Sequence, residues 1–182
     1  MDARTAPEQP TTSKQLATAP DTPAQNGPAR NGPAQQGIQP VTRERVIALL
    51  AQDDITAVEH PEADTVAVAT FNQLDWAFSI FDELVKVECI LPTTLSFADS
   101  AAFLRQIANE HNAAAFDGRV SVGDVDGQAE LRGDAVFVAS PGMTDAQLFH
   151  ALNFAVVAAQ DLLLQTLDTF NNLAQQLTTE QG

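Results

Sequence analysis

A long run of helical periodicity near the C-terminus constrains the fold more than any other feature of this sequence. Apolar residues from Thr144 to about Leu177 recur at steps of three and four, the period of an α-helix, and neither Pro nor Gly interrupts them. Thr144 and Gln147 have the spacing of a capping box, which predicts where the helix starts. Such a helix is about 50 Å long at 1.5 Å per residue. It is longer than a small domain is wide, so we expect something to cover its overhang.

The same helix carries apolar residues opposite its main stripe. At about 100° per residue, Phe154, Val157 and Leu164 fall among polar side chains. Val157 and Leu164 are seven positions apart and lie along one line, as in a narrow helix-packing seam. We therefore expect this face to bind a protein client or a second copy of the chain, with His150 and Asp161 at its rim. The alternative is an ordinary surface, since much of any protein surface is apolar.

Composition limits the class of protein. The chain has 182 residues, of which 45% are hydrophobic, enough for one globular domain and an unstructured segment. No long apolar run near the N-terminus and no uncharged apolar stretch of 18 residues is present, so we expect neither a signal peptide nor a membrane span. A cytoplasmic protein is the expectation. Cys89 is the single cysteine, which excludes an internal disulfide and a Cys-based zinc site.

The formal net charge of −15 belongs to residues 41–182. The first forty residues hold three basic and three acidic side chains, namely Arg4, Lys14 and Arg30 with Asp2, Glu8 and Asp21. A domain this acidic repels phosphate backbones and anionic lipids, so we expect neither a nucleic-acid nor a membrane partner. The acidity is typical of a solubility surface and also suits a basic protein client.

Residues 1–40 predict a disordered tail. They contain seven of the ten prolines and repeat Asn-Gly-Pro-Ala, at residues 26–29 and 31–34. Such a segment has too little apolar surface to offset the entropy of ordering it. We therefore divide the chain into a Pro/Ala/Gln-rich tail, 1–40, and a folded domain, 41–182.

The folded part predicts an α+β domain with an antiparallel sheet of about five to six strands. Short turns separate most of the strand patterns, whereas parallel strands would need a helical crossover between each pair. The helices are therefore expected to pack on one face of the sheet. The predicted order is a helix at 42–53, strands at 55–60, 65–71, 76–80 and 85–91, a helix at 96–112, strands at 119–124 and 128–139, and the long helix. Pro92 is expected to end the strand meander, and Asp126-Gly127 to form the turn of the second hairpin.

This order of elements resembles the YbjN domain, a bacterial family of sensory transduction regulators. Asn109-Glu-His-Asn112 at the end of the second predicted helix and Ser140-Pro-Gly-Met-Thr144 before the long helix carry the resemblance, which covers about residues 41–177. That family is similar in fold to the chaperones of type III secretion systems, which are small, acidic, dimeric α+β proteins that bind polypeptides. The resemblance implies a dimeric, non-enzymatic binding module without a cofactor.

No chemical motif points to an enzyme. The three histidines are scattered, and His111 has no second His at the spacing of a zinc protease. Asp124-Val-Asp126-Gly127 is similar to the start of a calcium loop but lacks the later Glu, so a hairpin turn is expected. We predict no metal and no cofactor. Asn112 is expected to cap the second helix, with ligand recognition as the alternative.

Two other functions stay open. A small-ligand sensor or hydrolase would use a sheet-lined pocket around Trp76 and would be monomeric. A structural monomer would have its long helix covered by residues 1–40, and their deletion would cause aggregation.

Overall fold

The computed structural model describes residues 37–180, with the backbone alone for Leu177, Thr178 and Glu180. Residues 1–36, where most of the predicted disordered tail falls, lie outside the described residues, as do residues 181–182. The first backbone pairing of the described chain joins Gln39 to Met143, just before the long helix.

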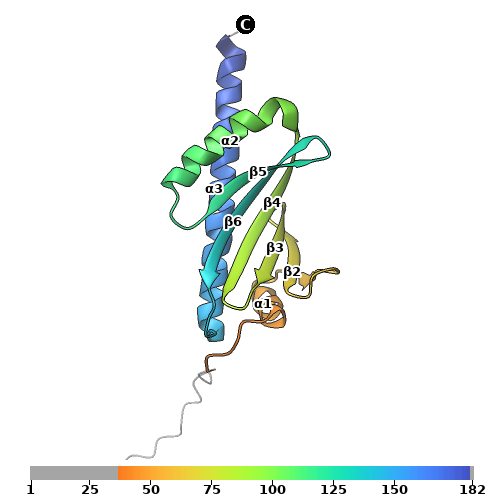
Figure 1. The fold of residues 1–182 in the computed structure, drawn as a ribbon, viewed down its shortest axis with the longest axis vertical. Helices are drawn as coiled ribbons and strands as arrows, with labels where there is room; N and C mark the ends of the chain where they lie inside the picture. Colours follow the sequence, from red (N-terminus) through yellow and green to blue (C-terminus); the bar gives the residue numbers. More distant parts are fainter. Residues whose placement is uncertain (1–36, 181–182) are drawn as a thin grey trace, which may run out of the picture. The chain divides into compact units, whose positions relative to one another are not determined.

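The described chain forms a six-stranded antiparallel sheet and three α-helices, which confirms the predicted α+β class (Figure 1). The strands are β1 (Ala57–Glu59), β2 (Val66–Phe71), β3 (Leu74–Ile80), β4 (Leu84–Ser96), β5 (Arg119–Val125) and β6 (Gln128–Val138). Their order across the sheet is β1-β2-β3-β4-β6-β5. The helices are α1 (Arg43–Leu50), continued by the short 3-10 turn η1 (Ala51–Asp53), α2 (Phe97–Ala114) and α3 (Asp145–Glu180).

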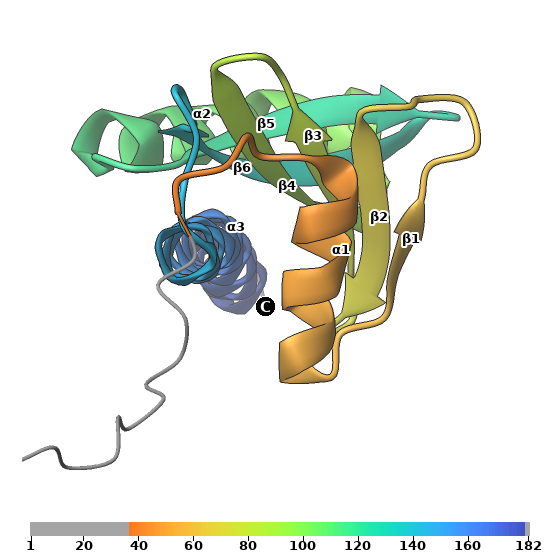
Figure 2. The same cartoon turned by 90° about the horizontal axis from the view of Figure 1, so that it is seen from below.

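The helices leave one face of the sheet uncovered. Figure 2 shows α1 and α3 on the same face, while α2 runs beside the edge strand β5 and also contacts α3. The apolar stripe of α3 that the sequence predicts faces the sheet, and its members Leu148, Leu152 and Leu163 are buried there. In the described part of the chain no helix lies over the opposite face.

The closest approach between α3 and the sheet depends on a glycine. A Cβ atom at Gly133 in β6 would lie 2.3 Å from the carbonyl oxygen of Ala159 and 3.0 Å from Sγ of Cys89. Since real Cβ atoms do not come so close to a backbone oxygen, only glycine fits at this position. The pair Gly133 and Ala159 therefore sets how deeply α3 sits against β6.

Local signals place the helix starts as predicted. Thr42 caps α1 by accepting a hydrogen bond from the Arg45 amide at 3.3 Å. At α3, the Thr144 amide donates to the Gln147 side chain at 2.9 Å and the Gln147 amide donates to the Thr144 hydroxyl at 3.2 Å. This reciprocal pair is the predicted capping box, and it satisfies two backbone donors that the helix leaves free.

The expectation that Pro92 ends the strand meander is wrong. β4 continues to Ser96, and Pro92 pairs with Glu130 of β6. The Leu84 carbonyl accepts a hydrogen bond from the Phe81 amide. Because backbone direction alternates along a strand, the N–H and C=O groups of the even-numbered β4 residues point toward β3. At Pro92 that side has no neighbour, because β3 begins only at Leu74, opposite Leu91 in this register. The missing N–H of proline therefore costs the sheet no hydrogen bond.

The turn of the second hairpin forms as predicted. Asp126 and Gly127 connect β5 to β6 with φ angles of 52° and 81°, the left-handed values that a two-residue turn between twisted strands requires. The Asp124 carboxylate accepts a hydrogen bond from the Gly127 amide at 2.9 Å. The Asp124 side chain therefore stabilises the hairpin turn.

Helix α2 covers part of the long helix. Phe103 lies 5.7 Å from Phe170 between ring centroids, and the His111 ring shares a hydrogen bond of 3.1 Å with the Thr169 hydroxyl. His111 is thus half-buried at a helix-helix boundary, as its place on the apolar stripe predicts. Beyond this crossing α3 projects past α2 (Figure 1).

Candidate functional site

The five residues predicted at the partner-binding face all lie on the side of α3 that turns away from the sheet. The exposed fractions are 60% for Phe154, 56% for Val157 and 38% for Leu164, which are large values for apolar side chains. His150 and Asp161 are exposed beside them. Exposed apolar residues that gather on one helix face are typical of a docking surface.

The structure brings three of these residues together with one that the sequence analysis missed. Phe154, Val157 and Asp161 line a surface hollow of about 400 Å³ whose other wall is the loop after α2, including Phe116. Neither His150 nor Leu164 lines it. We call Phe116, Phe154, Val157 and Asp161 the Phe116 surface.

Phe116 is fully exposed, although it is one of the largest apolar side chains in the chain. Its loop is held against α3 at Gly118, where a Cβ atom would lie 3.2 Å from the carbonyl oxygen of Ala158. The backbone is therefore anchored while the phenyl ring points to solvent. Its sequence signal is a phenylalanine just before the Asp117-Gly118 turn and outside any periodic stripe.

Asn112 holds the other end of this loop and at the same time protects a strand edge. Its side-chain amide donates to the Val120 carbonyl at 2.8 Å, and its side-chain oxygen accepts from the Val120 amide at 2.7 Å. The side chain thus takes the place of a neighbouring strand along the outer edge of β5. The predicted helix cap is not its role, since α2 continues to Ala114. The Asn112 amide is occupied within the fold.

The last part of β6 has a neighbour on one side only. The first residue of β5, Arg119, pairs with Asp134, whereas β4 pairs with β6 as far as Val138. Residues 135–138, which we call the open β6 edge, therefore lack a strand on the β5 side in the described structure (Figure 1). A further hollow of about 180 Å³ lies between its start and the loop that carries Phe116.

The charged groups near the Phe116 surface are mostly acidic. Helix α3 contains no Lys or Arg, and Asp117 and Asp161 line the larger hollow. Asp134 and Arg119 line the smaller one. Burial raises the pKa of Asp134 above its ordinary value, while the Lys86 ammonium opposes that shift. The surface is therefore apolar at its centre and predominantly anionic at its rim.

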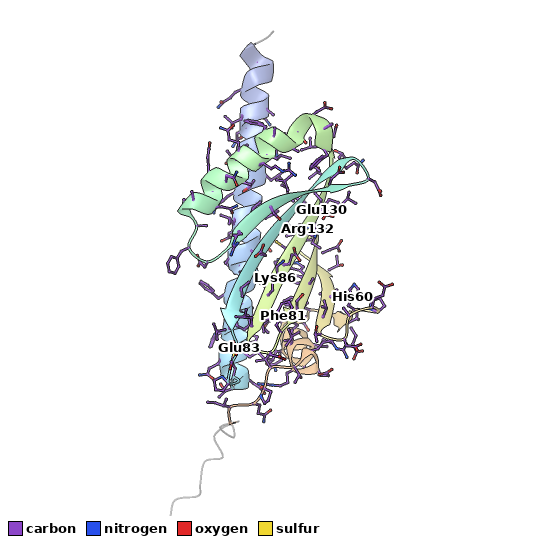
Figure 3. All side chains as sticks on the ribbon, viewed as in Figure 1. His60, Phe81, Glu83, Lys86, Glu130 and Arg132 are labelled. Carbon is purple, nitrogen blue, oxygen red and sulfur yellow. The ribbon has the colours of Figure 1, made fainter. Side chains whose placement is uncertain are left out.

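The uncovered face of the sheet is polar at its centre. Figure 3 labels Lys86, Glu130 and Arg132 on this face. Lys86 pairs with Glu88 at 3.2 Å and Arg132 with Glu130 at 2.6 Å. These charges neutralise one another, so the middle of this face offers little unpaired charge to a ligand.

Among the described residues, Trp76, around which a pocket was expected for a ligand sensor or hydrolase, lies in the packed core. Trp76 is 1% exposed and stacks on Phe71 with ring centroids 4.6 Å apart. Its indole N–H donates to the Phe71 carbonyl at 3.2 Å. The space that a ligand would need is filled by the core, because the alternation of β3 directs the indole inward between sheet and helices.

A polar cavity of about 510 Å³ lies where α1 begins. Arg43 lines it and pairs with Glu44 at 3.2 Å and Glu59 at 3.0 Å. Its Nε atom is buried without a hydrogen-bond partner. Asp64 and Asp82 complete the polar lining, so acidic groups outnumber the single cation.

Neither a metal-binding cluster nor an ionised thiol is found among the described side chains. Within residues 37–180 no group of three His, Cys, Asp or Glu is arranged to hold a metal ion. The Cys89 thiol is buried, and this burial raises its pKa to about 11, so it stays protonated near neutral pH.

Helix α3 is long and apolar enough to cross a membrane by length and composition alone. The core helix of a water-soluble domain passes the same test, and the main stripe of α3 lies against the sheet of this domain. This finding is therefore weak support for a membrane span.

Comparison with known proteins identifies the fold and the family. A family model for YbjN, described as "Putative bacterial sensory transduction regulator", matches residues 42–165. The crystal structure of YbjN from E. coli, described as a putative transcription regulator, is similar with a TM-score of 0.59 at 10% sequence identity. The similarity covers 73% of this chain and 96% of the E. coli chain. No curated protein matches the sequence.

Proposed function

Because the chain belongs to the YbjN family of bacterial sensory transduction regulators, we propose that it regulates by binding another protein and not by catalysis. The observation that carries this proposal is the gathering of Phe116, Phe154 and Val157 around one hollow. A fully exposed Phe on an anchored loop is difficult to explain as a requirement of the fold, whereas aromatic anchors are common at the centre of interfaces.

The acidic rim also supports protein binding and disfavours nucleic acid and anionic lipid as partners. With a formal net charge of −15, the chain repels nucleic acid and anionic lipid. The partner is a protein client or a second copy of the chain. We also propose a cytoplasmic location, in agreement with a single cysteine that is buried and unpaired.

The test compares two valine variants in the full-length protein. Val157→Asp places a charge in the Phe116 surface, and Val58→Asp places the same charge on β1, at the opposite edge of the sheet. The two side chains are 56% and 55% exposed, so either change should alter stability by less than about 0.5 kcal/mol. Melting temperatures check that both variants fold.

Affinity capture from the lysate of the native host then reads out binding, with captured proteins quantified by mass spectrometry. We expect a protein that the wild type and Val58→Asp retain and that Val157→Asp loses, with affinity reduced about 30-fold or more. Sedimentation of the same three proteins shows whether that partner is a second copy. The proposal is wrong if capture is equal for all three proteins and their masses in solution do not differ.

A further inference from the structure

Within residues 37–180, the open β6 edge presents backbone groups that no described strand uses. The Val120 amide and carbonyl form hydrogen bonds with the Asn112 side chain, so they point away from β6. In an antiparallel pair the backbone groups of successive residues alternate in direction, so the N–H and C=O groups of Arg119 and Asp134 point toward each other. At the other end of β6, the Ala139 amide donates to the Glu83 carbonyl on the β4 side.

The same alternation places the N–H and C=O groups of Val136 and Val138 on the side away from β4. No described strand lies on that side of these residues. A row of free donors and acceptors at a sheet edge is a template for pairing with another chain.

The two outer edges of the sheet, along β5 and β1, are protected in the described part of the chain. Asn112 blocks β5 at Val120, and the Arg105 guanidinium donates to the Val122 carbonyl at 3.5 Å. At the opposite end of the sheet β1 is three residues long and includes the charged Glu59. Short edge strands and edges covered by side chains resist unwanted pairing. The open β6 edge has no such protection from the described residues.

Apolar side chains surround this edge. Val136 and Val138 are 50% and 64% exposed, and Phe116 stands beside the hollow at the start of the edge. Phe154, on α3, shares the neighbouring hollow with Phe116. An added strand would therefore pair with β6 and bury apolar surface in the same step.

We propose that the open β6 edge, residues 135–138, receives an extended segment of the partner protein, which adds to the sheet as a strand in line with β5. This inference rests on the proposed function and names the form in which the partner is recognised. Four paired residues span about 13 Å, so the segment needs four to six residues. Apolar side chains at alternate positions contact Phe116 and Phe154, and basic residues flank them because Asp117 and Asp161 lie at the rim.

Charge selects another protein over a second copy of this chain. A second copy would bring the same aspartates and its own net charge of −15 to the contact, and like charges that meet at an interface are unfavourable. A segment with basic ends instead meets charges of opposite sign.

The test uses a fluorescein-labelled peptide of alternating Val and Thr with a Lys at each end. A control peptide has the same sequence but carries N-methyl groups on the residues whose amides would face β6. The second peptide keeps every side chain and loses the backbone donors. Fluorescence anisotropy measures the binding of both peptides to the full-length protein.

Two proline variants test the protein side. Val136→Pro removes one N–H at the open β6 edge. Glu59→Pro is the matched control, because the neighbouring His60 amide donates to Val66 of β2 and the Glu59 amide therefore points out of the sheet at β1. Proline is tolerated at sheet edges, and circular dichroism checks that both variants fold.

We expect saturable binding of the first peptide to the wild type and to Glu59→Pro, and binding weaker by about tenfold or more for the N-methylated peptide and for Val136→Pro. The amide signals of Val136 and Val138 should shift in nuclear magnetic resonance spectra on addition of the first peptide.

Three results overturn the proposal: equal binding of both peptides, no binding at millimolar peptide, or a wild-type dimer that Val136→Pro converts to a monomer. The last result identifies a second copy as the occupant. If Val157→Asp loses the captured protein while the two peptides bind equally or not at all, the proposed function stands. Only the strand-addition proposal is then wrong.

Discussion

At the scale of single residues, Asn112 shows how one polar side chain can serve the fold where the sequence leaves its role open. An asparagine near a helix end suggests a cap or a ligand contact. The Asn112 side-chain amide instead donates one hydrogen bond to the Val120 backbone and accepts another from it. A side-chain amide has the same donor and acceptor as a peptide group, so it can close a strand edge. Nothing near Asn112 in the sequence shows which edge will lie beside it.

Replacement of this asparagine should destabilise the protein. Asn112→Ala leaves the Val120 amide and carbonyl without their partner, and we expect the free energy of unfolding to fall by about 1–3 kcal/mol. Asn109→Ala, one turn earlier on an exposed position of α2, should change it by less than about 0.5 kcal/mol. Urea denaturation of both variants measures the difference. Equal stabilities would contradict the edge-closing role.

Cys89 should make stability depend on pH at the alkaline end. Burial raises the pKa of its thiol from 9.0 to about 11, so the folded protein holds this proton more tightly than the unfolded chain. Stability from this group is complete below pH 9 and is lost as the pH rises toward 11, by up to about 3 kcal/mol.

The control for this pH dependence is Cys89→Ala, which has no group that titrates there. Its free energy of unfolding should be lower overall and should fall less between pH 9 and pH 11 than that of the wild type. Denaturant titrations across this interval give both curves. Parallel curves would contradict the assignment to Cys89.

At the scale of the elements, the contact between α3 and β6 decides how the layers fit. The helix backbone at Ala159 approaches β6 so closely that position 133 has no room for a side chain. The periodicity of α3 predicts which stripe faces the sheet, but not that a glycine is needed across from it. Distance between layers is a property of both surfaces together.

Gly133→Ala should therefore be strongly destabilising. Its Cβ would overlap the Ala159 carbonyl, a backbone atom that cannot rotate away, and we expect a loss of about 2–4 kcal/mol. Gly123→Ala on β5 is the matched control, since the nearest atom to its Cβ would be 3.9 Å away. Thermal unfolding compares the two, and a similar melting temperature for both would show that α3 can shift at little cost.

At the scale of the whole molecule, net charge sets the response to salt. Lys and Arg number 9 and Asp and Glu number 24, so the folded chain repels itself. We expect the melting temperature to rise when NaCl is increased from low to near-molar concentration, because ions screen charges that lie more than about 3–10 Å apart. Differential scanning calorimetry measures the shift. A melting temperature that falls with NaCl would mean that favourable ion pairs outweigh the repulsion.

The candidate site was predicted in part. Helical periodicity alone placed Phe154 and Val157 on the exposed face of α3. Once one stripe of a helix packs against the sheet, the residues on the opposite side of the helix face away from it. Phe116 could not be placed, since a loop residue has no periodicity from which its direction follows. Its proximity to α3 results from the return of the chain after α2 at Gly118.

Local sequence patterns predict most of the elements, since helix period, strand alternation, the capping box at Thr144 and the Asp126-Gly127 turn all act between residues near in the chain. The sequence also determines the acidic charge and predicts the apolar outer face of α3. Three other features follow from long-range packing: β5 begins opposite Asp134, Pro92 lies inside a strand and Trp76 fills the core. These features depend on the register and spacing of segments far apart in the chain, and such contacts arise only when the layers pack together.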